Sequence, residues 1–172
     1  MAQKEEVTPD PLDSFTVIDP FSLVKHIPKE LACDFFGVFS RFEFALKEAG
    51  FKLDCRGVAQ ADWFKFAESV DNALKELRSA TLESAVEFII DEPPKVQSID
   101  LRWVPPIERT HSRYINSIFH IKQVRNNLFH GGKHPPSKPE RDIELIENSL
   151  VILKACLMTS YQVNEHYVTT EF

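Results

Sequence analysis

The fold class of this 172-residue chain is decided by residues 35–47, which read FFGVFSRFEFALK. Apolar side chains recur at steps of three and four residues through this stretch and on both sides of it, which is the spacing of one face of an α-helix. The face comprises Leu31, Phe35, Val38, Phe39, Phe42, Leu46 and Ala49. Pro28 suits the start of such a helix, and Gly50 suits the position just after its end. The pattern predicts a long amphipathic helix over about residues 29–49.

The same spacing recurs later in the chain and predicts further helices. These are expected over residues 62–77, over residues 79–90, from residue 107 or 110 to 129, and from residue 139 or 140 to 161. Residues 51–60 are expected to be a link. Residues 93–106 are bounded by two proline pairs and should form an irregular insert with room for a short strand. The prediction is an all-α antiparallel bundle of four to five helices.

The domain organisation follows from length and proline content. With 172 residues, 43% of them hydrophobic, the chain can form one domain with a substantial core. Residues 1–28 contain four prolines and few periodic apolar positions, so we expect an extended or poorly ordered arm. Residues 29–166 are expected to form the helical domain.

The amino-acid composition limits the cellular compartments and the binding partners that we expect for this protein. No apolar run approaches the roughly 20 residues of a membrane span, and residues 1–6 lack the basic start of a secretory signal. Three widely spaced cysteines suit reduced thiols, so a cytoplasmic protein that does not engage membranes is expected. The formal charge of -6 argues against nonspecific coating of nucleic acid. However, residues 120–139 carry four Lys or Arg, three His and no acid, so an anion site should lie there.

The chemically distinctive stretch is residues 125–130, Arg-Asn-Asn-Leu-Phe-His. In the helix expected there, one apolar stripe contains Tyr114, Ile118, Ile121 and Leu128. Arg125 falls within about 20° of Ile118, because seven residues nearly complete two turns. A guanidinium is very rarely buried alone, so a carboxylate, a chain terminus or a phosphate should meet it.

His130 follows Arg125 by five residues and comes directly before Gly131 and Gly132. The glycines should end the helix, which places His130 at its C-terminus, where the helix dipole favours the protonated imidazole. Asn126 and Asn127 add amide donors beside the pair. The glycines would also let a ligand approach the backbone closely.

These residue types suit cleavage of an RNA phosphodiester without a metal or other cofactor. A histidine near neutrality can move the proton of the 2′-hydroxyl or protonate the leaving 5′-oxygen. An arginine can hold the non-bridging oxygens as charge builds on them. Since one Arg–His pair supplies one proton-handling group, a symmetric homodimer that meets along this helix would bring two pairs into one cleft.

Arg125, four intervening residues and His130, on the penultimate long helix of an α-bundle, resemble the Arg-x4-6-His motif of the HEPN family. Residues 35–47 are also similar to the opening helix of that family, and the resemblance spans about residues 30–160. It implies a helical homodimer that is often a metal-independent ribonuclease in toxin–antitoxin or phage-defence systems, with RNA as substrate and an antitoxin protein as a possible partner. Arg125, Asn126 and His130 carry over as active-site residues, with Glu43 as the carboxylate that orients Arg125.

Other interpretations of these residues remain open. Arg125 could form a purely structural salt bridge with Glu43, and Glu43 could equally be solvated. His130 could serve only as a helix C-cap. Asn127 and Lys133 could contact phosphate, although a solvated loop is the ordinary place for Lys133. The glycines break the alignment of His130 with a second histidine four residues later, so no metal site is expected. A non-catalytic module that binds RNA, a nucleotide or a protein is the alternative function.

Overall fold

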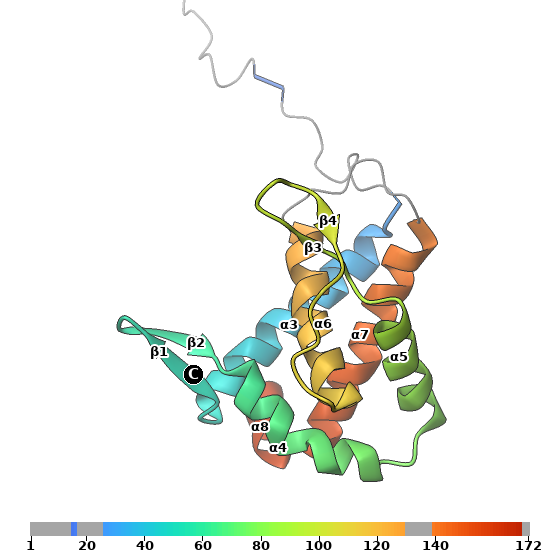
Figure 1. Ribbon diagram of the computed structural model, residues 1–172. Coiled ribbons are helices and arrows are strands. Elements are labelled where there is room, and N and C mark those ends of the chain that lie inside the picture. The colour runs from blue at the N-terminus through green and yellow to red at the C-terminus, as the bar shows by residue number, and fades with distance from the viewer. Residues whose placement is uncertain (1–14, 17–25, 130–138, 170–172) are drawn as a thin grey trace, which may run out of the picture.

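The computed structural model of this chain describes residues 15–16, 26–129 and 139–169. In order, its elements are α3 (Lys29–Glu48), β1 (Lys52–Cys55), β2 (Val58–Ala61), α4 (Trp63–Glu76), α5 (Ala80–Asp91), β3 (Val96–Gln97), β4 (Trp103–Val104), α6 (Arg113–Phe129), α7 (Pro139–Thr159) and α8 (Tyr161–Val168). Helices dominate, and the strands form only two small hairpins, so the prediction of an all-α helical bundle is confirmed (Figure 1).

Both ends of α3 lie where the sequence places them. The helix follows Pro28 directly and ends at Glu48. Gly50 adopts a φ of 84°, and the amides of Gly50 and Phe51 bond back to the carbonyls of Lys47 and Leu46. This pair of bonds is the Schellman arrangement, which needs a left-handed residue that glycine provides at little cost.

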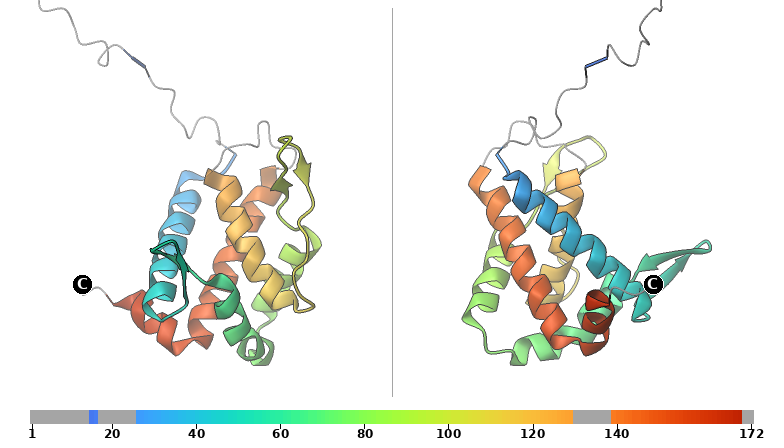
Figure 2. Two further views of the ribbon diagram at one scale, coloured as in Figure 1. Left: turned by 60° about the vertical axis from the view of Figure 1, so that its left-hand side comes forward. Right: turned by 180° about the vertical axis from the view of Figure 1, so that it is seen from behind.

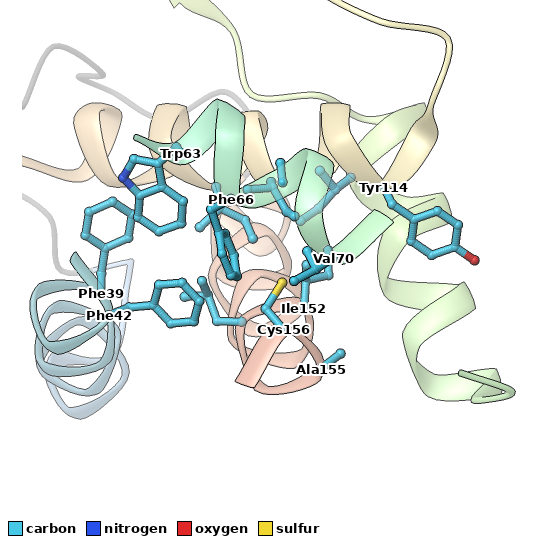
Figure 3. Packing of buried hydrophobic residues seen from close by; sticks show 14 of the residues in the cluster. Phe39, Phe42, Trp63, Phe66, Val70, Tyr114, Ile152, Ala155 and Cys156 are labelled. Carbon is cyan, nitrogen blue, oxygen red and sulfur yellow. The ribbon is translucent and has the colours of Figure 1, made fainter. Parts of the chain in front are cut away.

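An aromatic cluster joins α3 to α4. The Trp63 ring stacks on the rings of Phe39 and Phe42, at centroid distances of 5.1 and 5.4 Å. The Phe66 ring meets Phe42 edge-on at 5.4 Å. Figure 3 shows these rings gathered between α3 and α4, and it shows Cys156 of α7 in the same buried cluster. All five side chains are buried, so the start of α4 is firmly held against α3.

The segment expected to be a link is instead a β-hairpin. Strands β1 and β2 pair antiparallel through a two-residue loop, Arg56-Gly57. Both loop residues have positive φ, as a tight hairpin turn with the right twist requires. The Asp54 carboxylate supports the turn by accepting a 2.6 Å bond from the Gly57 amide. The hairpin projects from the bundle (Figures 1 and 2).

The expected insert near residues 93–106 contains the very short hairpin β3–β4. This hairpin lies at the end of the bundle where α6 ends and α7 begins, and these two helices therefore run antiparallel (Figures 1 and 2). The Asn127 side-chain amide ties the insert to α6 through a 2.8 Å bond to the Lys95 carbonyl.

The last expected helix is α7, which ends at Thr159, and a further helix that was not predicted, α8, follows it after Ser160. The Arg41 side chain of α3 donates to the carbonyls of His166, Tyr167 and Thr169, and so caps the C-terminal end of α8. These bonds join segments far apart in the sequence, which explains why local periodicity does not reveal α8. No helix in the described part of the chain is both long and apolar enough to cross a bilayer.

Candidate functional site

The structure describes four of the six predicted site residues. Arg125, Asn126 and Asn127 lie in the last turns of α6, and Glu43 lies on α3. His130 and Lys133 lie outside the described residues. The described residues therefore include the arginine of the predicted Arg125–His130 pair and its surroundings.

Arg125 continues the apolar stripe of α6 at the end of the bundle. Ile118 and Ile121 on this stripe are fully buried, whereas Arg125 is half-buried. Its Nη1 donates a 3.1 Å hydrogen bond to Oδ1 of Asn126, and its guanidinium lies 5.6 Å from the Phe39 ring centroid. A guanidinium over an aromatic face is stabilised by the ring quadrupole. The aromatic cluster of α3 and α4 thus extends to the predicted catalytic arginine.

Glu43 has a different neighbour from the one predicted for it. Its Oε1 accepts a 3.1 Å hydrogen bond from Nε1 of Trp63. Glu43 forms no ion pair with Arg125, although both residues belong to the described part of the chain. The carboxylate therefore satisfies the buried indole. Orientation of Arg125 by Glu43 stays a prediction without a contact to support it.

Asn127 uses both ends of its amide within the protein. Its Nδ2 donates to the Lys95 carbonyl, and its Oδ1 accepts a 2.7 Å bond from Nε2 of Gln123. These bonds fix the insert beside the end of α6. A phosphate contact by Asn127 would have to use the second hydrogen of Nδ2, so the bonds that the structure shows give this residue an anchoring role.

A group of cations beside Arg125 was not anticipated as a site. Lys122 is half-buried, and this burial lowers the pKa of its ammonium. Arg109 and Arg125 lower it further, while the carboxylates of Glu43 and Asp62 act in the opposite direction. The sequence marked residues 120–139 as basic, but Arg109 precedes α6 and joins the group only through the fold.

His120 is the described histidine on α6, and it is buried. Burial lowers its pKa to about 4, because a charged imidazole would lose its hydration. The side chain is therefore neutral at physiological pH and is poorly suited to exchanging protons there. Within the described ranges, no three His, Cys, Asp or Glu side chains are placed to hold a metal ion.

The chain matches no known family model, no curated protein and no solved structure. Its function is therefore inferred from the chemistry of the site. The described part of the site contains a half-buried arginine at a helix end, a neighbouring asparagine amide and a group of cations. Such groups bind anions with several oxygens, of which phosphate is the most common biological example.

Proposed function

We propose that this chain is a metal-independent endoribonuclease of the HEPN type, acting as a cytoplasmic homodimer in a toxin–antitoxin or phage-defence system. One observation carries the proposal. Arg125 continues the stripe of Ile118 and Ile121 near the end of α6, where it is half-buried, five residues before His130. A charged residue at an otherwise apolar position, next to a candidate proton donor, is typical of a functional site.

The proposed reaction is a transesterification within the RNA. The 2′-oxygen attacks the adjacent phosphorus, and the bond from phosphorus to the 5′-oxygen breaks. A base accepts the 2′-hydroxyl proton, and an acid protonates the leaving 5′-oxygen. The products are a 2′,3′-cyclic phosphate and a 5′-hydroxyl. The guanidinium of Arg125 would bind the non-bridging oxygens as negative charge accumulates on them.

Two proton-handling groups are needed, and one chain supplies one candidate. His120 does not fill the second role, because its pKa of about 4 leaves it a weak base inside the core. A second copy would contribute the other His130 if the two α6 helices meet across a two-fold axis. The homodimer is therefore part of the proposed mechanism.

The test is cleavage of single-stranded and tRNA-like substrates in the presence of EDTA. The wild type should produce cyclic phosphate ends, whereas Arg125→Ala and His130→Ala should each lose cleavage while keeping their helical circular dichroism. Arg78→Ala and His111→Ala are matched controls, because both residues are exposed and lie outside the site. Equal cleavage by the wild type and His130→Ala would exclude this function.

A non-catalytic binding module is the second candidate. It is favoured by the single proton-handling group per chain and by the net charge of -6. In this case no RNA would be cut, and His130→Ala would weaken ligand binding at most. A strictly monomeric chain in sedimentation equilibrium would contradict both candidates, because neither would then have its composite cleft.

A further inference from the structure

A row of aromatic and basic side chains leads along α6 to Arg125, and we call it the α6 strip. It consists of Arg109, Phe119 and Lys122, with Phe64 contributed by α4. The Arg109 guanidinium lies 4.7 Å from the Phe119 ring centroid, and the Phe119 ring lies 5.9 Å from that of Phe64. Phe64 is 43% exposed, so part of this aromatic surface faces solvent.

The strip has a definite direction along the helix. Phe119 and Lys122 are three residues apart and share one face of α6, and Asn126 follows four residues later on the same face. At 1.5 Å per residue, the distance from Phe119 to Asn126 along the axis is about 10 Å. Asn126 accepts the hydrogen bond from Arg125, so the strip ends at the proposed catalytic arginine.

The cations of the strip form no ion pair in the described part of the chain. No carboxylate there lies within 4 Å of the charged nitrogens of Arg109 or Lys122. The carboxylates of Glu43 and Asp62 are close enough to raise the pKa of Lys122, but their hydrogen bonds come from Trp63 and from the Lys65 amide at the start of α4. The strip is thus a local basic surface on an acidic protein.

We propose that the α6 strip binds a single-stranded segment of RNA and leads it to Arg125. An unpaired base would stack on Phe64 and Phe119, while Arg109 and Lys122 would contact flanking phosphates. Interleaved aromatic and basic side chains are suited to this ligand, because every base has a flat face and every linkage carries a charge. The proposal names the substrate-binding surface of the proposed ribonuclease and so rests on that function.

The arrangement favours single-stranded over double-stranded RNA. Stacking requires the face of an unpaired base, which a duplex does not offer. A protein partner would have to supply acids opposite Lys122 and Arg109 together with an apolar group opposite Phe64. A nucleotide chain offers both features in each repeating unit, which is why we favour it.

Binding is best measured in the full-length chain carrying His130→Ala, so that the probe stays intact. The probe is a fluorescein-labelled, unstructured single-stranded RNA of mixed sequence, followed by fluorescence anisotropy, with a duplex of the same sequence in parallel. The test substitutions, added singly to this background, are Phe64→Leu, Phe119→Leu, Arg109→Ala and Lys122→Met. Leucine removes the ring but keeps an apolar side chain, so the fold should survive. Tyr161→Leu on α8 and Lys154→Met on α7 are matched exposed controls.

We expect each phenylalanine substitution to weaken single-strand binding roughly tenfold, as loss of one stacked base would. Lys122→Met and Arg109→Ala should also lower the salt dependence of binding by about one phosphate contact each. The two controls should bind as the background does, and the duplex should bind more weakly than the single strand.

Three results would contradict RNA binding by the α6 strip. They are undiminished RNA binding by the four strip variants, no RNA binding by the background protein, and tighter binding of the duplex than of the single strand. Conversion of these variants to monomers in sedimentation equilibrium would instead identify the strip as a contact between copies. The two proposals can also fail separately. If the wild type cleaves RNA and the strip variants keep its KM, the proposed role of the strip is wrong and the proposed ribonuclease stands. If RNA binding depends on the strip but no RNA is cleaved, the proposed ribonuclease is wrong and the binding surface stands.

Discussion

The two ends of α6 differ in the partners of their polar and charged side chains. At its start, Ser112 donates a 2.5 Å hydrogen bond to Asp71, and the Tyr114 hydroxyl donates to Glu83. Arg113 lies 3.7 Å from the same Glu83. These three side chains meet acids from α4 and α5, so the start of α6 is an anchored end.

The last turns of α6 carry cations in a different setting. Lys122 is half-buried with no carboxylate within 4 Å among the described residues, and Arg125 bonds to the neutral amide of Asn126 and packs on Phe39. Burial lowers the pKa of the Lys122 ammonium, so holding this cation charged reduces stability. The anchored end therefore supports the fold, whereas the cations of the other end belong to the site that we propose for a ligand. Four measurements test this difference between the two ends of α6.

The largest effect is expected between the two ends, where Ile118 is fully buried. Ile118→Ala removes apolar packing and leaves a cavity, so the free energy of unfolding should fall by about 3 kcal/mol. Urea denaturation followed by circular dichroism measures this change. A loss below about 1 kcal/mol would mean that the stripe on which Arg125 lies is not part of a tight core.

The next effect is a pH dependence from His120. Its pKa falls from 6.5 when unfolded to about 4 when folded, so the unfolded chain binds the proton first as the pH drops. Stability should be complete above about pH 6.5 and should decline as the pH falls toward 4, by about 2 kcal/mol at pH 5. His120→Leu should show a shallower decline over this range. Parallel stability profiles of the two proteins would contradict the assignment.

A smaller loss is expected at the anchored end from Tyr114→Phe. This substitution removes the hydroxyl bonded to Glu83, and hydrogen bonds to charged groups contribute about 1–3 kcal/mol. We expect a loss of about 1.5 kcal/mol in urea denaturation. Tyr161→Phe is the control, because Tyr161 is 80% exposed, and it should leave stability unchanged. Equal effects of the two substitutions would remove the distinction between the anchored end and ordinary surface.

The smallest change in stability is expected at Arg125. Methionine can cover Phe39 in its place at an otherwise apolar position, so Arg125→Met should alter the free energy of unfolding by less than about 1 kcal/mol in either direction. The same variant should lose RNA cleavage. If it instead loses more than about 3 kcal/mol, Arg125 is a structural residue, and the contrast between the two ends of α6 disappears.

Local signals in the sequence predict most of the helices. Periodic apolar residues placed α3, Pro28 marked its start, and Gly50 marked its end. They also identified Arg125 as an arginine at an apolar position. By contrast, the β1–β2 hairpin escaped prediction, because its four-residue strands are too short for an alternating pattern. The first of its two positive-φ turn positions is Arg56 rather than the Asn, Asp or Gly that usually marks such a turn.

The partners of individual side chains were less predictable than the elements. Glu43 was expected to meet Arg125 but bonds to Trp63, since the indole nitrogen is buried beside it and needs an acceptor. The sequence is compatible with either Arg125 or Trp63 as the partner of Glu43, because Glu43 lies near the point where α3, α4 and α6 approach one another. Only packing decides which donor reaches the carboxylate.

The helical class, the extent of the long helices and the position of Arg125 on its stripe could be predicted from the sequence, because they depend on interactions within a few residues of the chain. The grouping of Arg109, Phe64, Phe119 and Lys122 could not be predicted and follows from the tertiary structure. These residues come from three separate segments, and the distances between their side chains are set by the packing of α4 against α6 rather than by spacing in the sequence.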